Sequence, residues 1–404
     1  MTGTAPGGWS RVRVDWVMDE LRESLRPEQL AGREVFHYSI PALSEHGDGV
    51  IEDGDSIASS KFVLRGGELL VSKLNPRKGH VYVARAPLTP TVCSSEFIVL
   101  RPRACDVRFM FYFFSSETVR QELAARVQSV TKSHQRVGPD EITKMWVRVP
   151  NVRVQRAIAD FLDRETARLD EVMRLHVRLG LLVDERYRAK LDSQYSSSGW
   201  PLTRLKHLLA VRPSYGVLVP RFVDAEGTRF VRVSDLSTLE ARADQLIQIH
   251  REQSEEYGRT IVTSGDVLVS VVGSLEGVAI VGEKTAGCNI ARAVARLRPR
   301  KGVAPKLLAG WVGTSGYVEQ AAAATADDSV QPTLNMGDLA NFELRFPADP
   351  ESQWAALHAL ITTEGQRDKL ESRVARQIRL LQELRQTLIT SAVTGQLAIP
   401  GGMA

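Results

Sequence analysis

Apolar residues recur at alternating steps of three and four along the stretch from residue 154 to residue 193. This spacing is typical of a coiled-coil seam, because it keeps one face of an α-helix apolar over many turns. No proline interrupts the stretch. The sequence therefore predicts a long helix here, with a seam formed by Ile158, Leu162, Leu169, Val172, Leu179 and Val183.

A second stretch, from residue 351 to residue 391, repeats the pattern and ends near Gly395, a residue type that favours the end of a helix. Its predicted seam is Leu370, Val374, Ile378, Leu381 and Leu388. A helix of about 40 residues is a rod of roughly 60 Å, longer than a globular core requires. We interpret the two helices as spacers that pack against each other. The alternatives are two packing helices of a helical domain, or the seam of a homodimer.

The segments between the helices are rich in β-type runs and are related to each other. Residues 64–84 align without a gap with residues 262–282, and residues 133–150 correspond to residues 329–347, so each block recurs roughly 190 to 200 residues later. Each copy of the first block is a strand, a glycine-containing loop and a strand. The predicted fold class is α+β, with two β-rich globular domains separated by two long antiparallel coiled-coil helices in a pseudo-twofold internal repeat.

This repeat divides the chain into domains. We expect a first globular domain at 1–153, a first helix and joint at 154–196, a second globular domain at 197–350, a second helix at 351–397 and a tail at 398–404. The chain has 404 residues, of which 43% are hydrophobic, enough for two substantial cores.

Charge and cysteine content narrow the chemistry only slightly. The net charge of +4 permits a nucleic-acid partner without requiring one. The three cysteines have no CxxC spacing, which favours neither a disulfide framework nor a zinc site. The sequence shows no secretory leader and no apolar run long enough to span a membrane, so we expect a cytoplasmic protein.

The last helix ends in LRQTLITSAVTGQL, residues 384–397, and this ending, the two-repeat layout and the LLVSKLNPRKG and SVQPTLN blocks resemble the specificity (S) subunits of Type I restriction-modification enzymes. The resemblance implies two target recognition domains, each contacting one part of a bipartite, asymmetric double-stranded DNA site. It also implies a scaffold for two methyltransferase (M) subunits and for restriction (R) subunits. The M subunits would carry S-adenosylmethionine, and this chain would bind no cofactor. The first helix departs from the family pattern, because it lacks the SAVTG-like ending.

No recognisable catalytic motif occurs in the sequence. An adenine methyltransferase needs a glycine-rich cofactor loop and an Asn/Asp-Pro-Pro-aromatic site for the flipped base, and neither is present. Walker A and G-x-G-x-x-G spacings are also missing. We therefore expect a non-catalytic subunit.

Sequence-specific DNA binding requires Arg or Lys for guanine, Asn or Gln for adenine, and further polar groups for phosphate. Two loops at matched positions of each repeat supply such residues. In the first domain the candidates are Lys73, Asn75, Arg77, Lys78, Lys132, Ser133, His134, Gln135 and Arg136. In the second domain they are Ser270, Ser274, Glu276, Asn289, Arg292, Ser329, Gln331 and Thr333, with Glu276 a possible acceptor for a cytosine amino group. Arg101, Arg103, Arg298 and Arg300 are interpreted as phosphate contacts or surface charges.

An interface with M subunits would need exposed apolar residues outside the helix seam. Leu181, Leu182, Leu380 and Leu384 are the candidates. The alternative to a DNA-binding subunit is a protein-binding adaptor with two β-rich modules on a coiled-coil spacer, and this adaptor would show no salt-dependent affinity for DNA.

Overall fold

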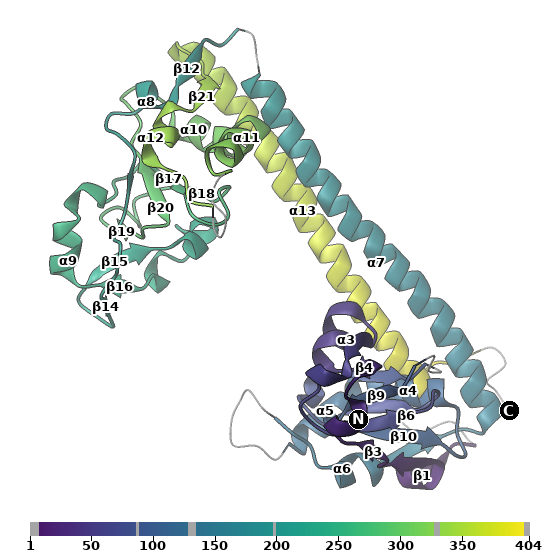
Figure 1. The fold of residues 1–404 in the computed structure, drawn as a ribbon. Helices are drawn as coiled ribbons and strands as arrows, with labels where there is room; N and C mark the ends of the chain where they lie inside the picture. Colours follow the sequence, from purple (N-terminus) through teal and green to yellow (C-terminus); the bar gives the residue numbers. More distant parts are fainter. Residues whose placement is uncertain (1–7, 86–88, 128–134, 197–198, 327–331, 400–404) are drawn as a thin grey trace. The chain divides into compact units, whose positions relative to one another are not determined.

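The computed structural model describes residues 8–85, 89–127, 135–196, 199–326 and 332–399. The chain divides into two compact units (Figure 1). The first unit runs to His176 and also takes in the chain from Arg376 onward, and the second unit is Val177–Ala375. Each unit therefore contains one globular segment and part of each of the two longest helices.

The first unit contains two main sheets. One is an antiparallel four-stranded sheet of order β2-β10-β7-β8, and the other is a five-stranded sheet of order β3-β6-β9-β4-β5, in which β4 and β9 are parallel. A small pair, β1-β11, joins the beginning and the end of the globular segment. The strands are β1 (Ser10–Arg13), β2 (Met18–Leu21), β3 (Ser24–Leu25), β4 (Glu34–Tyr38), β5 (Val50–Asp53), β6 (Lys61–Leu64), β7 (Leu69–Ser72), β8 (Val81–Val83), β9 (Thr91–Ser94), β10 (Phe97–Pro102) and β11 (Trp146–Val149).

The second unit repeats this plan with shorter strands. Its antiparallel sheet has the order β13-β20-β17-β18, and its second sheet has the order β14-β16-β15-β19 with β15 parallel to β19. The pair β12-β21 corresponds to β1-β11. The strands are β12 (Leu202–Arg204), β13 (Ser214–Tyr215), β14 (Phe222–Val223), β15 (Thr228–Val231), β16 (Gln248–Ile249), β17 (Val267–Ser270), β18 (Val278–Ile280), β19 (Asn289–Ile290), β20 (Val294–Leu297) and β21 (Glu343–Arg345).

Short helices cover one face of each antiparallel sheet. In the first unit these are α4 (Val107–Ser115) and α5 (Glu117–Ala125), and in the second they are α10 (Pro305–Val312) and α11 (Ser315–Ala324). Two of them begin at a side-chain cap: Asp106 accepts hydrogen bonds from two amides of α4, and Thr314 accepts one from Tyr317 in α11. The remaining helices are α1 (Val14–Val17), α2 (Pro27–Leu30), α3 (Ile40–His46), α6 (Pro139–Thr143), α8 (Leu205–Leu208), α9 (Arg251–Glu256) and α12 (Met336–Asn341).

The cores lie where these helices meet the sheets and the long helices. In the first unit, Leu69 and Ile98 of the sheet pack in one cluster with Phe109 of α4 and Leu162 of the first long helix. In the second unit the corresponding cluster includes Trp311 and Leu360. The globular segments are thus fixed to the helices by buried apolar surface, the dominant favourable term in folding.

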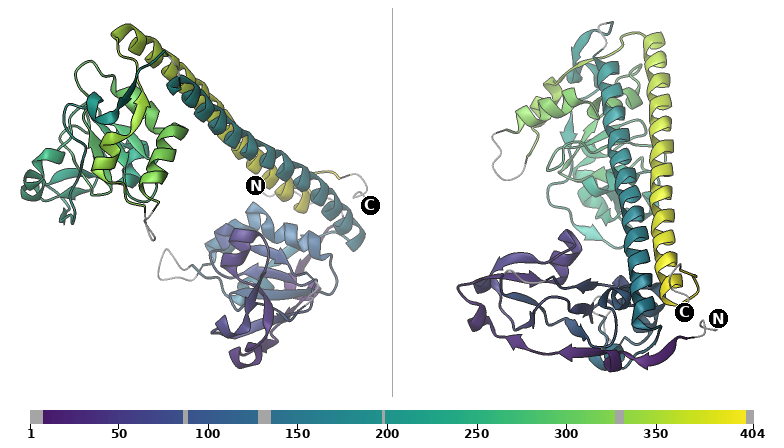
Figure 2. Two further views of the ribbon diagram at one scale, coloured as in Figure 1. Left: turned by 45° about the horizontal axis from the view of Figure 1, so that its top comes forward. Right: turned by 90° about the vertical axis from the view of Figure 1, so that its right-hand side faces the viewer.

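The two long helices, α7 (Val152–Tyr195) and α13 (Pro350–Val393), each contain 44 residues. Within each unit their segments lie side by side and antiparallel (Figure 2). Asp170 binds Arg385 at 3.0 Å in the first unit, and the side-chain Nε2 of Gln194 donates to the Ala356 carbonyl at 2.8 Å in the second. The expected fold class, with two β-rich domains and long paired helices in an internal repeat, is confirmed.

The predicted helix seam is correct in part. Ile158, Leu162 and Val183 are buried, but Val172 is 37% exposed and Leu179 is 46% exposed. The inward positions between Leu162 and Val183 include Gly180, whose Cα faces Val374 closely enough that an added Cβ would lie 3.8 Å from it. Val172 and Leu179 thus belong to a second, solvent-exposed apolar stripe of the helix.

Candidate nucleic-acid interface

In the first unit, the loop after β7 lies beside the segment that precedes α6. Leu74 forms an antiparallel bridge with Arg136. The amide of Asn75 donates to the Gln135 carbonyl at 2.7 Å, and the amide of Val137 donates to the Lys73 carbonyl at 3.0 Å. The two segments form one surface, which we call the first loop platform (residues 73–79 and 135–137).

The shape of this platform depends on two residues with positive φ. Asn75, at φ 49°, begins the short 3-10 helix Pro76–Lys78, and Gly79, at φ 62°, ends it. A Cβ at Gly79 would lie 2.3 Å from Cδ of Arg120, so glycine lets α5 pack directly against the turn. Arg77 and Lys78 are exposed at this turn and are available to a ligand.

The second unit brings the equivalent segments together in the same way. Val272 forms an antiparallel bridge with Thr333. The amide of Gly273 donates to the Pro332 carbonyl at 3.0 Å, and that of Leu334 donates to the Val271 carbonyl at 2.8 Å. We call this surface the second loop platform (residues 271–277 and 332–335). The pairing recurs at matched positions of the repeat, while the side chains differ.

The candidate residues of the second unit fall into two groups. Ser274, Glu276, Arg292 and Thr333 are exposed. Ser270 and Asn289 are fully buried: Ser270 Oγ accepts from the Gly277 amide at 2.8 Å, and the Asn289 amide nitrogen donates to the Ser254 carbonyl at 3.1 Å. The Ser270 side chain therefore stabilises the loop that follows β17, and the Asn289 side chain joins β19 to α9.

Five candidates lie outside the residues that the structure describes. They are Lys132, Ser133, His134, Ser329 and Gln331.

Each platform includes one ion pair that ties it to its own unit. Arg136 binds Glu96 at 2.6 Å, and Glu276 binds Arg188 of α7 at 2.6 Å. All four side chains are partly or largely solvent-exposed, and exposed pairs of this kind contribute about 0–1 kcal/mol to stability. Such pairs can open toward a charged ligand at little cost.

Two of the four arginines at the ends of β10 and β20 pair with buried carboxylates. Arg101 binds the fully buried Glu68 at 2.7 Å, and Arg298 binds the buried Asp266 at 2.7 Å. Glu68 and Asp266 occupy the same position of the repeat, immediately before β7 and β17. The pair is therefore a shared structural feature of the two domains. Arg103 binds Asp19 at 3.1 Å, and Arg300 donates to the Leu209 carbonyl at 2.9 Å.

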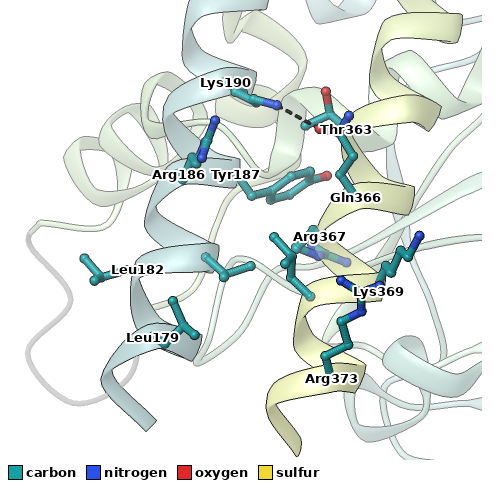
Figure 3. A pocket seen from close by; sticks show the side chains of 12 residues that line it. Leu179, Leu182, Arg186, Tyr187, Lys190, Thr363, Gln366, Arg367, Lys369 and Arg373 are labelled. Atoms are coloured by element: carbon teal, nitrogen blue, oxygen red, sulfur yellow. Dashed lines mark hydrogen bonds between the residues drawn. The ribbon is translucent and has the colours of Figure 1, made fainter. Parts of the chain in front are cut away.

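A groove lies between α7 and α13 in the second unit (Figure 3). It has a volume of about 430 Å³, and its apolar lining residues include Leu179, Leu182 and Leu370. The ring of Tyr187 points from α7 toward α13, and the Arg367 guanidinium lies 4.3 Å from its centroid. The rim carries the cationic side chains of Arg186, Lys190, Arg367, Lys369 and Arg373.

Of these groove residues, the sequence predicted Leu182 as a partner contact, and this residue is 49% exposed; Leu179, Val183 and Leu370 were predicted as seam residues. Leu181, Leu380 and Leu384 are 66%, 46% and 53% exposed, so all four predicted leucines are at the surface. The cationic rim was missed, because charged residues on a helix usually mark a solvated face and only the pairing of α7 with α13 brings these together.

Among the residues that the structure describes, no group of three or more His, Cys, Asp and Glu side chains is arranged to hold a metal ion. None of the helices in the described part of the chain is long and apolar enough to cross a bilayer.

The two β-rich domains, each packed against segments of two 44-residue helices, define a duplicated α+β fold with a loop platform in each copy. A solved structure with this fold comes from work on complex assembly and conformational transition of the type I R-M system. It superimposes with a TM-score of 0.72 at 20% identity, covering 98% of this chain and 100% of that chain. The HsdS subunit from Thermoanaerobacter tengcongensis superimposes with a TM-score of 0.51 at 20% identity, covering 98% of this chain and 99% of that one.

The sequence is similar to the specificity subunit of the Type I restriction enzyme EcoBI from Escherichia coli. The two are 25% identical over 341 residues, which cover 76% of this chain and 71% of the relative. No family model matches the chain. The resemblance to specificity subunits of Type I restriction-modification enzymes is thus confirmed in sequence by this relative, and the fold is that of the solved HsdS subunit.

Proposed function

We propose that this chain is the sequence-specific DNA-binding specificity subunit of a Type I restriction-modification complex. The observation that carries the proposal is the loop platform, which recurs at the same place in both domains with different side chains. A repeated scaffold that presents different donors and acceptors suits a bipartite site whose two halves differ in sequence.

The two platforms would contact their half-sites with different chemistry. The first presents Lys73, Asn75, Arg77, Lys78 and Arg136, a set rich in groups for guanine, adenine and phosphate. The second presents Ser274, Glu276 and Thr333, with Arg292 as a further candidate. We leave Ser270 and Asn289 out of the proposed contacts because their polar atoms are bonded inside the domain. The proposal retains Lys132, Ser133, His134, Gln135, Ser329 and Gln331.

The proposal assigns catalysis to partner subunits. Two methyltransferase subunits, which would hold S-adenosylmethionine and modify adenine, would dock on exposed apolar residues of the long helices, Leu181, Leu182, Leu380 and Leu384, of which Leu182 also lines the groove between α7 and α13. Restriction subunits would complete a nuclease complex. The proposed domain limits are those of the repeat, with recognition domains at 1–153 and 197–350 and helical segments at 154–196 and 351–397.

Methylation mapping tests this function. The chain is co-expressed with a cognate methyltransferase in cells that lack other adenine methylation, and the modified positions in genomic DNA are sequenced. We expect one motif with two short specified parts separated by a fixed unspecified gap. The control is the methyltransferase expressed alone. An equal methylation pattern with and without the chain, or a single continuous motif, would reject the proposal.

A further inference from the structure

Four arginines surround one pocket in the second unit. The pocket has a volume of about 580 Å³ and is lined by Arg212, Arg259, Arg296 and Arg298, together with Ser214 and Tyr215. It lies where β13 meets β20, next to the 3-10 turn Gly258–Thr260. Asp266, which binds Arg298, is the carboxylate paired with this cluster, and in the described part of the chain the other three arginines form no ion pair.

Arg296 is the unusual member of this cluster. It is only 5% exposed, and its Nε is buried without a hydrogen-bond partner among the described residues. Ser214, its cross-strand neighbour on β13, also has a buried hydroxyl without a partner there. Burial lowers the pKa of Arg296, and the nearby Arg298 lowers it further. Buried donors without acceptors are costly, so the arrangement is stabilised when an acceptor enters the pocket.

The first unit shows that the fold does not need an arginine here. At the matched position of β10 it has Val99, paired across the sheet with Leu21 of β2 and Leu70 of β7. Val99 is 1% exposed and packs in an apolar cluster with Leu70. In the second unit the equivalent cross-strand neighbours of Arg296 are Ser214 and Leu268. The same scaffold position is therefore apolar in one copy and cationic in the other.

The neighbouring Arg298 has a different task. Its pair with Asp266 repeats the pair of Arg101 with Glu68, so it belongs to the shared scaffold. Because Asp266 neutralises Arg298, the unpaired positive charge around the pocket comes from Arg212, Arg259 and Arg296. Guanidinium groups present several N–H donors in a planar fork that matches the oxygens of a phosphate.

We propose that this pocket is an oxyanion site that binds a phosphate group, with Arg296 and Ser214 as the inner donors and Arg212 and Arg259 at its entrance. The ligand we assign is a backbone phosphate of the DNA bound by the second domain, an assignment that rests on the proposed function. Free phosphate or a phosphorylated metabolite offers the same chemistry. The site would anchor the second domain on DNA independently of base sequence.

The test uses the variant Arg296→Val, which restores the residue type that the first unit has at this position. The matched control is Arg242→Val, which removes an exposed arginine of the same unit that does not line the pocket. Thermal unfolding of the full chain is measured in inorganic phosphate and in chloride at equal ionic strength. DNA affinity of the chain with its methyltransferase is measured over a range of salt concentrations, on cognate and unrelated duplexes.

We expect phosphate to raise the unfolding temperature of the wild type and of Arg242→Val but not of Arg296→Val. In chloride, Arg296→Val should unfold at the same temperature as the wild type or higher, because a buried unpaired donor is gone. Its DNA affinity should fall about tenfold on both duplexes. The slope of log affinity against log salt should become shallower by about 0.9, as one phosphate contact is lost.

Three other results would change the assignment of the pocket or of the function. Protection by phosphate that depends on Arg296, with DNA affinity unchanged by the substitution, would assign the pocket to free phosphate and overturn the DNA assignment. Equal behaviour of Arg296→Val and the wild type in both assays would overturn the site itself. Failure of the wild-type complex to bind DNA at all would count against the proposed function, while the phosphate assay would still decide the pocket.

Discussion

Glu68 and Asp266 each bury a carboxylate at the start of the strand that leads into a loop platform. Glu68 accepts hydrogen bonds from the Arg65 amide and from Arg101, and Asp266 accepts from the Thr263 amide and from Arg298. Each arginine is partly exposed, so removal of a carboxylate would mainly leave the amide of the turn without its acceptor, and an unsatisfied buried donor costs about 1–3 kcal/mol. These residues therefore fix the tight turns before β7 and β17, the two strands that lead into the loop platforms.

His37 is a buried titratable residue of the first unit. Its Nδ1 lies 3.0 Å from Glu52 Oε2, and its Nε2 is buried without a partner among the described residues. Burial lowers the pKa of His37, an effect that Glu52 offsets in part, and burial also lowers the pKa of His80. A histidine with a lowered folded-state pKa binds fewer protons in the folded chain than in the unfolded chain.

We predict that the chain loses stability as the pH falls below about 6.5, the ordinary histidine pKa, and continues to do so until the folded-state pKa is reached. Above that window His37 is neutral in both states and contributes no pH dependence. His37→Gln keeps a donor for Glu52 and removes the titration, so part of the drop should disappear. Unfolding temperatures at pH 7.5 and 5.5 measure it, with the exposed His46→Gln as control. Equal drops in wild type and His37→Gln would contradict the prediction.

At the scale of elements, α7 shows why the sequence predicted the helix but not its inner face. Its apolar residues form two stripes. The inner stripe includes Leu162 and Val183, whereas the outer stripe, Val172, Leu175, Leu179 and Leu182, is between 37% and 55% exposed. The exposed residues Val172, Leu175, Leu179 and Leu182 themselves have spacings of three and four, so periodicity alone identifies an α-helix and leaves open which face packs against α13.

Leu182 belongs to the surface that we propose for methyltransferase docking. Leu182→Glu should leave folding unchanged, because the side chain is already half exposed, and should weaken association with the methyltransferase at least tenfold by placing a charge in an apolar contact. Sedimentation or calorimetric titration with the purified methyltransferase measures the affinity. Leu202→Glu, at a leucine on β12 that is 59% exposed, is the matched control. Loss of binding in both variants, or in neither, would argue against this docking surface.

At the scale of the whole molecule, the internal repeat was the most informative part of the sequence. It predicted the two β-rich domains, because these follow from local strand and turn patterns that occur twice, but not the pairing of the two loops within each domain, which depends on long-range bridges such as Leu74 with Arg136. It did not predict that Ser270 and Asn289 face inward, since their exposure depends on distant partners such as Gly277 and Ser254. It also gave no sign of the arginine pocket, which forms only when β13 pairs with β20.

The repeat leads to a prediction about modular specificity. Exchanging residues 199–350 for the same segment of a relative should change one half of the methylated motif and leave the other half intact, because the first platform is built entirely from the first unit. Methylation mapping of the exchanged chain measures both halves in one experiment. The reciprocal exchange of the first globular segment is the control. A change in both halves would refute independent recognition by the two domains.

The last turns of α13 belong to the core of the first unit. Ile389, Ala392 and Val393 lie in the core cluster of the first unit, and Gln386 donates to the Ser115 carbonyl at 3.1 Å. During synthesis, amino-terminal segments usually fold as soon as they leave the ribosome. Here the first domain cannot bury its full core until α13 has been made, so a ribosome must translate both globular segments before the first of them is complete. Translation that stops within α13 would leave the first domain without part of its core, although the break lies more than 200 residues further along the chain.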